Sequence, residues 1–149
     1  MPERSNGLAW KASRRVSVSW VQIPVPPPWN FMIQITPEIT EIIENNPVAF
    51  ATVGLDGGPH CVAVAEVKVV SDSQILIGDN YMVTTKNNLK KDSRVALVVW
   101  NEEREGFRLR GSADYFSDGK WLKMVKEIHK GYPAKGAILV TFSEITKLH

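Results

Sequence analysis

The chain has 149 residues, which suits one domain with one core, and its 44% hydrophobic and 23% charged residues are ordinary for a globular protein. One cysteine excludes an internal disulfide and a cysteine cluster for zinc, and no apolar run is long enough to cross a bilayer. The formal net charge of +2 is small and unevenly distributed, so it does not indicate a nucleic-acid surface on the domain.

Residues 1–31 differ in composition from the rest of the chain. They carry a net charge of +3, three of the five tryptophans and a proline-rich stretch at residues 24–28, whereas the remaining residues carry a net charge of −1. We expect a disordered or non-native arm over residues 1–31 and a domain over residues 32–149, with no nucleic-acid or membrane partner. An alternative is that the cations and tryptophans of the arm bind single-stranded nucleic acid.

The first helix and strand signals follow Ile35. Thr36 followed by Pro37 is typical of a helix start, because threonine caps the first turn and proline fits its first position. Isoleucines at 39, 42 and 43 share one helical face, and the Asn-Asn-Pro sequence at 45–47 ends the helix. The apolar run Val48–Val53 predicts a strand, and the glycine-rich residues 54–58 predict a hairpin turn after it.

Further strands are predicted at residues 60–70, 74–78, Arg94–Trp100, Gly106–Phe116 and 137–142. A short helix is expected from about Thr84 and a longer one from Asp118 to about Lys130. Six strands joined mostly by hairpin turns, with flanking helices, indicate a mainly β fold whose antiparallel sheet closes into a small barrel. The connections are too short for repeated parallel βαβ units, and Rossmann and P-loop patterns are absent from the sequence.

The strongest functional signal in the residues themselves is the helix that begins at Thr84-Thr85-Lys86. A helix start offers free backbone N–H groups and the positive end of the helix dipole, and hydroxyls and lysines add donors and charge. This arrangement indicates a phosphate site, to which Lys90 and Lys91 can contribute. The alternative is a solvated, capped surface helix.

An ordered series of segments resembles the FMN-binding split-barrel family related to pyridoxamine 5'-phosphate oxidase, and is most similar to its short single-domain FMN-binding members. The similarity covers most of residues 35–146. The matching segments are Phe50-Ala51-Thr52-Val53, Asp56-Gly57-Gly58-Pro59-His60, Ile77-Gly78-Asp79-Asn80, Thr84-Thr85-Lys86-Asn87-Asn88-Leu89, Arg94-Val95-Ala96-Leu97, Phe107-Arg108-Leu109-Arg110-Gly111-Ser112-Ala113 and Lys135-Gly136-Ala137-Ile138-Leu139-Val140.

The resemblance implies a six-stranded antiparallel split β-barrel that forms a homodimer, with two non-covalent FMN molecules in grooves between the subunits. It implies a cytoplasmic oxidoreductase or electron-transfer protein whose electron donor is a nicotinamide or another protein. Two alternatives stay open. One is a deazaflavin-dependent reductase of the same fold, and the other is a module that binds flavin or pyridoxal phosphate without turnover.

The resemblance also assigns cofactor-binding residues, although it identifies no catalytic residue. The ring would lie along the second strand with Asp79, Asn80 and Tyr81 at the mouth, and Trp100 would pack near the partner's flavin. Many members carry a lysine at the position of Thr84, whereas this chain has Lys86 two places later. The predicted ring contacts are Val62, Ala63, Val64, Ala65 and Glu66, and the predicted phosphate contacts are Thr84, Thr85, Lys86, Asn88 and Arg110.

Several of these residues also have an interpretation without a role in cofactor binding. Glu66 and Arg110 would otherwise be solvent-facing strand residues, Tyr81 a loop aromatic, and Trp100 a core or interface residue without flavin contact.

The remaining chemically active residues give no separate site. The three scattered histidines His60, His129 and His149 make a poor metal set and lack evident partners in the sequence, so no metal is expected. Cys61 lies beside apolar residues, and we expect it to be buried and inert.

Overall fold

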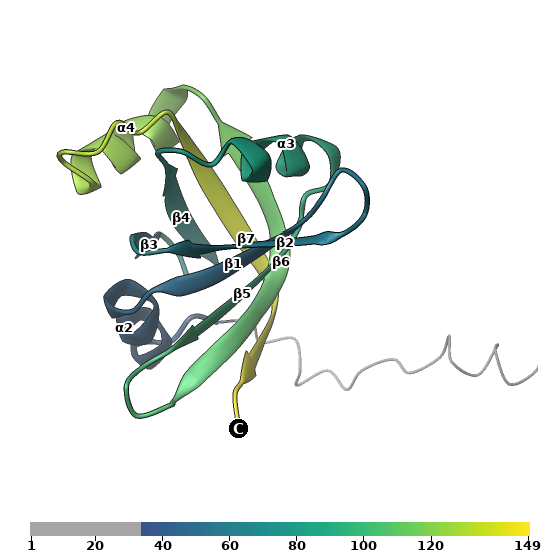
Figure 1. The fold of residues 1–149 in the computed structure, drawn as a ribbon. Coiled ribbons are helices and arrows are strands. Elements are labelled where there is room, and N and C mark those ends of the chain that lie inside the picture. Colours follow the sequence, from purple (N-terminus) through teal and green to yellow (C-terminus); the bar gives the residue numbers. More distant parts are fainter. Residues whose placement is uncertain (1–33) are drawn as a thin grey trace, which may run out of the picture. The chain divides into compact units, whose positions relative to one another are not determined.

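Seven antiparallel strands form one curled sheet in the order β2-β1-β5-β6-β7-β4-β3 (Figure 1). The computed structural model describes residues 34–149, so the arm predicted over residues 1–31 lies outside the described residues. The elements are α2 (Pro37–Asn45), β1 (Val48–Val53), β2 (Pro59–Val64), β3 (Val67–Val69), β4 (Gln74–Asp79), α3 (Val83–Lys91), β5 (Arg94–Trp100), β6 (Gly106–Phe116), α4 (Gly119–Ile128) and β7 (Gly136–Lys147).

The fold is mainly β, as the sequence predicts, and its first helix begins where expected. The hydroxyl of Thr36 accepts a hydrogen bond from the N–H of Ile39 at 3.4 Å, and Pro37 occupies the first turn. The three buried isoleucines of α2, at 39, 42 and 43, pack against the main core. The β1–β2 hairpin is also confirmed, and its turn contains Gly57 at a positive φ of 83°, which glycine adopts without a Cβ clash.

The prediction of one strand over residues 60–70 is wrong, and this accounts for seven strands instead of six. The chain bends at Ala65 and Glu66, so that β2 pairs with β1 while β3 pairs with β4. Because β2 and β3 are the two end strands of the sheet, this two-residue bend carries the chain from one edge of the sheet to the other. The bend therefore lies at the seam of the curled sheet, which is the place where its two end strands, β2 and β3, are joined.

The other strands extend the sheet by regular antiparallel pairing. The last strand, β7, is longer than the predicted 137–142, because it pairs with β4 and with nearly the whole of β6. One register shift lies between Arg110 and Gly111 of β6. A Cβ at Gly111 would stand closer to the Thr141 carbonyl oxygen than real Cβ atoms do, so the close approach of β6 to β7 at this register shift requires glycine.

Helices α3 and α4 lie at the upper end of the curled sheet in Figure 1, and α2 lies near its lower end. The main core joins α2 and α3 to the inner face of the sheet, and a smaller cluster holds α4 against β4 and β7 through Val125, Leu76 and Ala137. The helix α4 ends at Ile128, two residues earlier than expected, and His129 is its C-cap.

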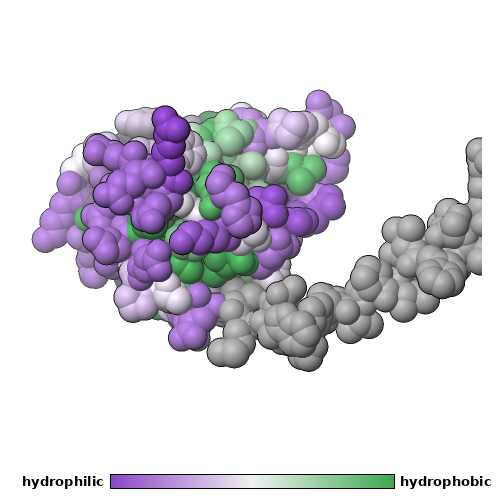
Figure 2. Space-filling model, turned by 90° about the horizontal axis from the view of Figure 1, so that it is seen from below, coloured by the Kyte–Doolittle hydropathy of each residue, from purple (hydrophilic) through white to green (hydrophobic). Residues whose placement is uncertain are grey.

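The surface seen from below is mostly hydrophilic, with a smaller apolar area between the polar groups (Figure 2). Within residues 34–149, no helix has the length and apolar character needed to span a membrane. The same residues contain no cluster of three side chains able to hold a metal ion.

Candidate functional site

A groove of about 320 Å³ opens along the seam of the sheet, where β2 ends. Its walls come from β2, the bend after it, the end of β4, the loop leading into α3 and the segment after α4. The lining residues are Val62, Ala63, Val64, Ala65, Glu66, Gly78, Asn80, Tyr81, Met82, His129 and Tyr132.

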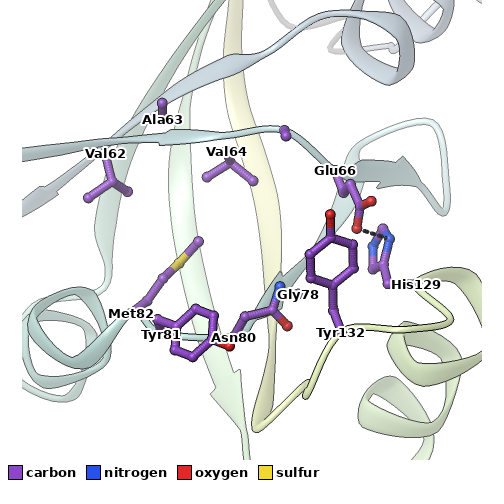
Figure 3. Close-up of a pocket in the computed structure, with 11 residues that line it drawn as sticks. Val62, Ala63, Val64, Glu66, Gly78, Asn80, Tyr81, Met82, His129 and Tyr132 are labelled. Atoms are coloured by element: carbon purple, nitrogen blue, oxygen red, sulfur yellow. Dashed lines mark ion pairs between the residues drawn. The ribbon is translucent and has the colours of Figure 1, made fainter.

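One wall of the groove is an unpaired strand edge. As an end strand of the sheet, β2 pairs only with β1, so backbone N–H and C=O groups along its other side are free to bind a ligand. The side chains of Val62 and Val64 project toward Met82, whereas that of Ala63 points away (Figure 3). The groove thus combines apolar side chains with a row of backbone donors and acceptors.

The start of α3 lies at one end of this groove. Met82 is its N-cap and donates its N–H to Oδ1 of Asp79 at 2.7 Å, and the N–H of Val83 reaches the carbonyl of Tyr81. The N–H groups of Thr84 and Thr85 have no acceptor among the described residues, and the first turn contains no acidic residue. Free amides at a helix start attract an anion.

The predicted phosphate residues divide into exposed and buried ones. Thr84 is exposed, but Thr85 is only 1% exposed and its hydroxyl lacks a hydrogen-bond partner. Asn88 is buried as well and donates from Nδ2 to the hydroxyl of Thr52 at 3.0 Å, which ties α3 to β1. The Nζ of Lys86 stands 4.9 Å from the centre of a tyrosine ring in a neighbouring hollow.

Asp79 was predicted at the mouth of the groove, but its side chain does not line it. Its carboxylate is 4% exposed and accepts hydrogen bonds from the N–H of Met82 and the hydroxyl of Tyr115, both at 2.7 Å. Burial, the hydrogen bond to Asp79 and its negative charge together raise the pKa of the Tyr115 hydroxyl. Asp79 therefore fixes the turn that leads into α3.

A second hollow of about 240 Å³ adjoins the groove and shares Tyr81 and Met82 with it. Three lysines line this hollow, Lys86, Lys90 and Lys135, and none of them forms an ion pair with a described residue. Lys135 holds its Nζ 5.5 Å from the centre of the Tyr81 ring. This arrangement can receive a negatively charged group that extends from the groove.

The opposite end of the groove is polar, and the sequence does not indicate His129 or Tyr132 there. Nδ1 of His129 lies 2.6 Å from Oε2 of Glu66, so the expectation that His129 lacks a partner is wrong (Figure 3). Tyr132 and Asn80 complete this end, and Oδ1 of Asn80 is buried with no partner. No local pattern could reveal the ion pair, because it joins the bend after β2 to the end of α4.

Two other predicted site residues lie away from the groove. Trp100 is 51% exposed and lines a separate hollow on the outer face of the sheet with Cys61, which is itself exposed, contrary to the expectation that it is buried. Arg110 is exposed and pairs with Glu144 at 3.4 Å.

Seven of the predicted residues meet in the groove, and they are Val62, Ala63, Val64, Ala65, Glu66, Asn80 and Tyr81. Those that do not line it are Asp79, Thr84, Thr85, Lys86, Asn88, Trp100 and Arg110. The lining residues that the sequence did not indicate are Gly78, Met82, His129 and Tyr132.

The chain is similar to known proteins over most of residues 34–149. Residues 35–149 match the family model described as pyridoxamine 5'-phosphate oxidase. An uncharacterized protein of Methanocaldococcus jannaschii is 31% identical over 123 residues, which are 78% of this chain and 83% of that protein.

Three solved structures share the fold at low sequence identity. HupZ of Group A Streptococcus has a TM-score of 0.72 at 22% identity, covering 76% of this chain and 94% of that one. An FMN-binding protein of Syntrophomonas wolfei has a TM-score of 0.68 at 14% identity, covering 93% and 97%. An F420 reductase has a TM-score of 0.57 at 19% identity, covering 70% and 92%. The curled sheet is thus of the split-barrel type.

Proposed function

This chain belongs to the pyridoxamine 5'-phosphate oxidase family, and from that premise we propose that it is a flavoprotein that binds FMN non-covalently in the groove. A bound flavin supplies the redox chemistry, because its ring accepts and releases electrons, while the protein binds and orients the ring. The proposal makes the chain an oxidoreductase or electron-transfer protein.

The observation that carries this proposal is the combination of three features in one groove. Apolar side chains of Val62, Val64 and Met82 suit the faces of a flat aromatic ring. The free edge of β2 offers backbone groups for the polar edge of that ring. Beside them, the start of α3 offers two free amides for a phosphate. The residues present therefore fit FMN.

The phosphate would be held by backbone N–H groups and lysine rather than by the side chain of Thr85. The amides of Thr84 and Thr85 are free, whereas the Thr85 hydroxyl is buried beneath the helix. Lys86 is the charged partner that we assign, because it lies in the hollow that adjoins the groove. Asn88 supports the site by anchoring α3 to Thr52.

We also assign the outer sheet face to a homodimer interface. On this face Ala49 pairs with Ala63 on one side and Val98 on the other, so small apolar side chains form a continuous strip. Trp100 and Cys61 are exposed on the same face. Because exposing an indole ring to water is unfavourable, Trp100 favours an interface here.

The test of the proposed function is the absorbance spectrum of the purified protein after incubation with FMN, followed by NADH and then NADPH without oxygen. Bound flavin that bleaches would establish a reductase and identify its donor. Bound flavin that stays yellow would favour a protein donor or a module that binds flavin without turnover. A protein that takes up no FMN would overturn the proposal.

A second candidate is a deazaflavin with an extended acidic tail, and the three lysines of the second hollow favour it. Such a tail would continue from the groove past Tyr81 toward Lys90 and Lys135. Parallel titrations with FMN and F420 decide between them, because the tail adds affinity only if the lysines bind it.

A further inference from the structure

We propose that His129, positioned by Glu66, donates a proton at the polar end of the groove when a bound flavin accepts a hydride. The inference rests on the proposed function and adds to it a residue with a defined chemical task. It starts from the one ion pair of the described residues that lines the groove.

The pair has a fixed geometry. With Nδ1 of His129 2.6 Å from Oε2 of Glu66, a hydrogen occupies the space between the two atoms. This hydrogen bond fixes the orientation of the imidazole and leaves Nε2 as the nitrogen that can exchange a proton with a ligand. Glu66 is therefore a positioning residue, and His129 is the proton donor.

The fold places this pair at the groove through two local features. Glu66 lies in the bend between β2 and β3, and His129 is the C-cap of α4. Gly78 lets the ring approach, because a Cβ there would stand 3.3 Å from Cδ2 and 3.9 Å from Nε2 of His129. The edge of the imidazole that carries Nε2 thus rests on Gly78, which is itself part of the groove wall.

The exposure of the two side chains suits these two roles. The side chain of His129 is 9% exposed, which keeps competing water away from it, while that of Glu66 is 43% exposed and reaches solvent. Tyr81 and Tyr132 are the other titratable residues of the groove lining. Both are phenols, and a phenol is a much weaker acid than an imidazolium near neutral pH, so neither replaces His129 as proton donor.

The step balances in protons and electrons. A hydride donor such as a dihydronicotinamide delivers two electrons and one hydrogen to the oxidised flavin and leaves as the oxidised nicotinamide. His129 gives one proton from Nε2 and becomes neutral, so the flavin gains two electrons and two hydrogens in total. Because Nδ1 keeps its hydrogen bond to Glu66, His129 then regains its proton at Nε2, from water that enters the groove when the nicotinamide leaves.

The test uses the variants His129→Gln and Glu66→Gln, with His149→Gln and Glu103→Gln as matched controls at exposed positions. Each protein is first titrated with FMN to obtain its dissociation constant. The FMN complex is then reduced without oxygen by 1-benzyl-1,4-dihydronicotinamide, a small hydride donor, in water and in deuterium oxide. Imidazole nitrogen NMR of the flavin-free protein reports separately whether Nδ1 of His129 is hydrogen bonded to Glu66.

We expect His129→Gln to bind FMN normally but to be reduced about a hundredfold more slowly, and Glu66→Gln about tenfold more slowly. The solvent isotope effect on reduction of the wild type should diminish in His129→Gln, and the controls should match the wild type. Reduction of His129→Gln at the wild-type rate would overturn this inference and leave the proposed function standing. So would loss of FMN binding in His129→Gln, because His129 would then be a binding residue. Failure of the wild type to bind FMN would overturn both.

Discussion

The hydroxyl of Tyr115 on β6 donates a 2.7 Å hydrogen bond to Oδ2 of Asp79, the last residue of β4. The other oxygen of the same carboxylate accepts the N–H of Met82, which is the N-cap of α3. One buried side chain thereby connects the sheet to the start of the helix that we assign to phosphate binding. The geometry of the site depends on this connection.

The first prediction concerns that hydrogen bond. Tyr115→Phe removes the donor and leaves a buried carboxylate with one partner fewer, so we expect the free energy of unfolding to fall by about 1.5–3 kcal/mol. Urea denaturation followed by circular dichroism measures the change. Tyr81→Phe is the control, because Tyr81 is 73% exposed, and its variant should lie within about 0.5 kcal/mol of the wild type. Equal stability of all three proteins would refute the role given to the pair.

The second prediction is a dependence on alkaline pH. Burial, together with Asp79, raises the pKa of Tyr115 above the ordinary value of 10.0, so the folded protein holds this proton more tightly than the unfolded chain does. The resulting stabilisation is fully present below pH 10.0 and is lost as the pH rises toward the pKa of the folded state. The stability difference between wild type and Tyr115→Phe should therefore shrink above pH 10.0. A difference that stays constant or grows there would contradict the shift.

The third prediction separates phosphate binding from general charge. Lys86→Ala should weaken FMN binding about tenfold, the scale of one lost charged hydrogen bond, and should leave binding of riboflavin, which lacks the phosphate, unchanged. Lys120→Ala is a matched control, because Lys120 also stands over an aromatic ring, 4.5 Å from the centre of Trp121. Fluorescence titration gives the affinity of each of the three proteins for FMN and for riboflavin. If Lys86→Ala lost equal affinity for FMN and riboflavin, Lys86 would not be the residue that binds the phosphate.

The fourth prediction tests the homodimer. Trp100→Glu places a charge on the apolar outer face, so we expect it to convert a dimer into monomers, measured as molar mass by light scattering. Leu55→Glu serves for comparison, because Leu55 is 54% exposed, close to the 51% of Trp100, but lies at the β1–β2 turn. A wild type that is already monomeric, or a Trp100→Glu dimer, would refute the assigned interface.

Much of the fold could be predicted because its signals are local. Thr36 and Pro37 specify a helix start within one turn, and the apolar run of β5 predicts a strand. The same run predicts burial on both faces, whereas only alternate residues of β5 are buried. That the segment around Val62 lines a groove follows a prediction made from family resemblance, since backbone contacts leave no pattern in the residues, and its binding of a flavin ring stays a prediction. Structure that depends only on neighbouring residues could therefore be predicted from the sequence.

Features that depend on residues far apart in the chain could not be predicted from the sequence. The bend at Ala65 and Glu66 exists because β2 and β3 pair with different strands. Its one local sign is a shift of the alternation by one residue, from Val64 in β2 to Val67 in β3, and this shift does not identify the two pairing partners. The partner of His129 is Glu66, which lies 63 positions earlier in the chain, in the bend between β2 and β3. Thr85 was assigned to a phosphate from its position at a helix start and from the family resemblance, but its side chain is buried.

The most direct test of FMN binding in the groove is a titration of flavin-free protein with FMN, monitored by quenching of flavin fluorescence. The wild type and two variants are compared: Val62→Phe, which puts a large side chain into the groove, and Val69→Phe, which changes a half-buried valine on β3 outside it. We expect saturable binding of one FMN per chain, weakened at least about tenfold in Val62→Phe and unchanged in Val69→Phe. A folded wild type that binds no FMN, or equal affinity in all three proteins, would contradict it.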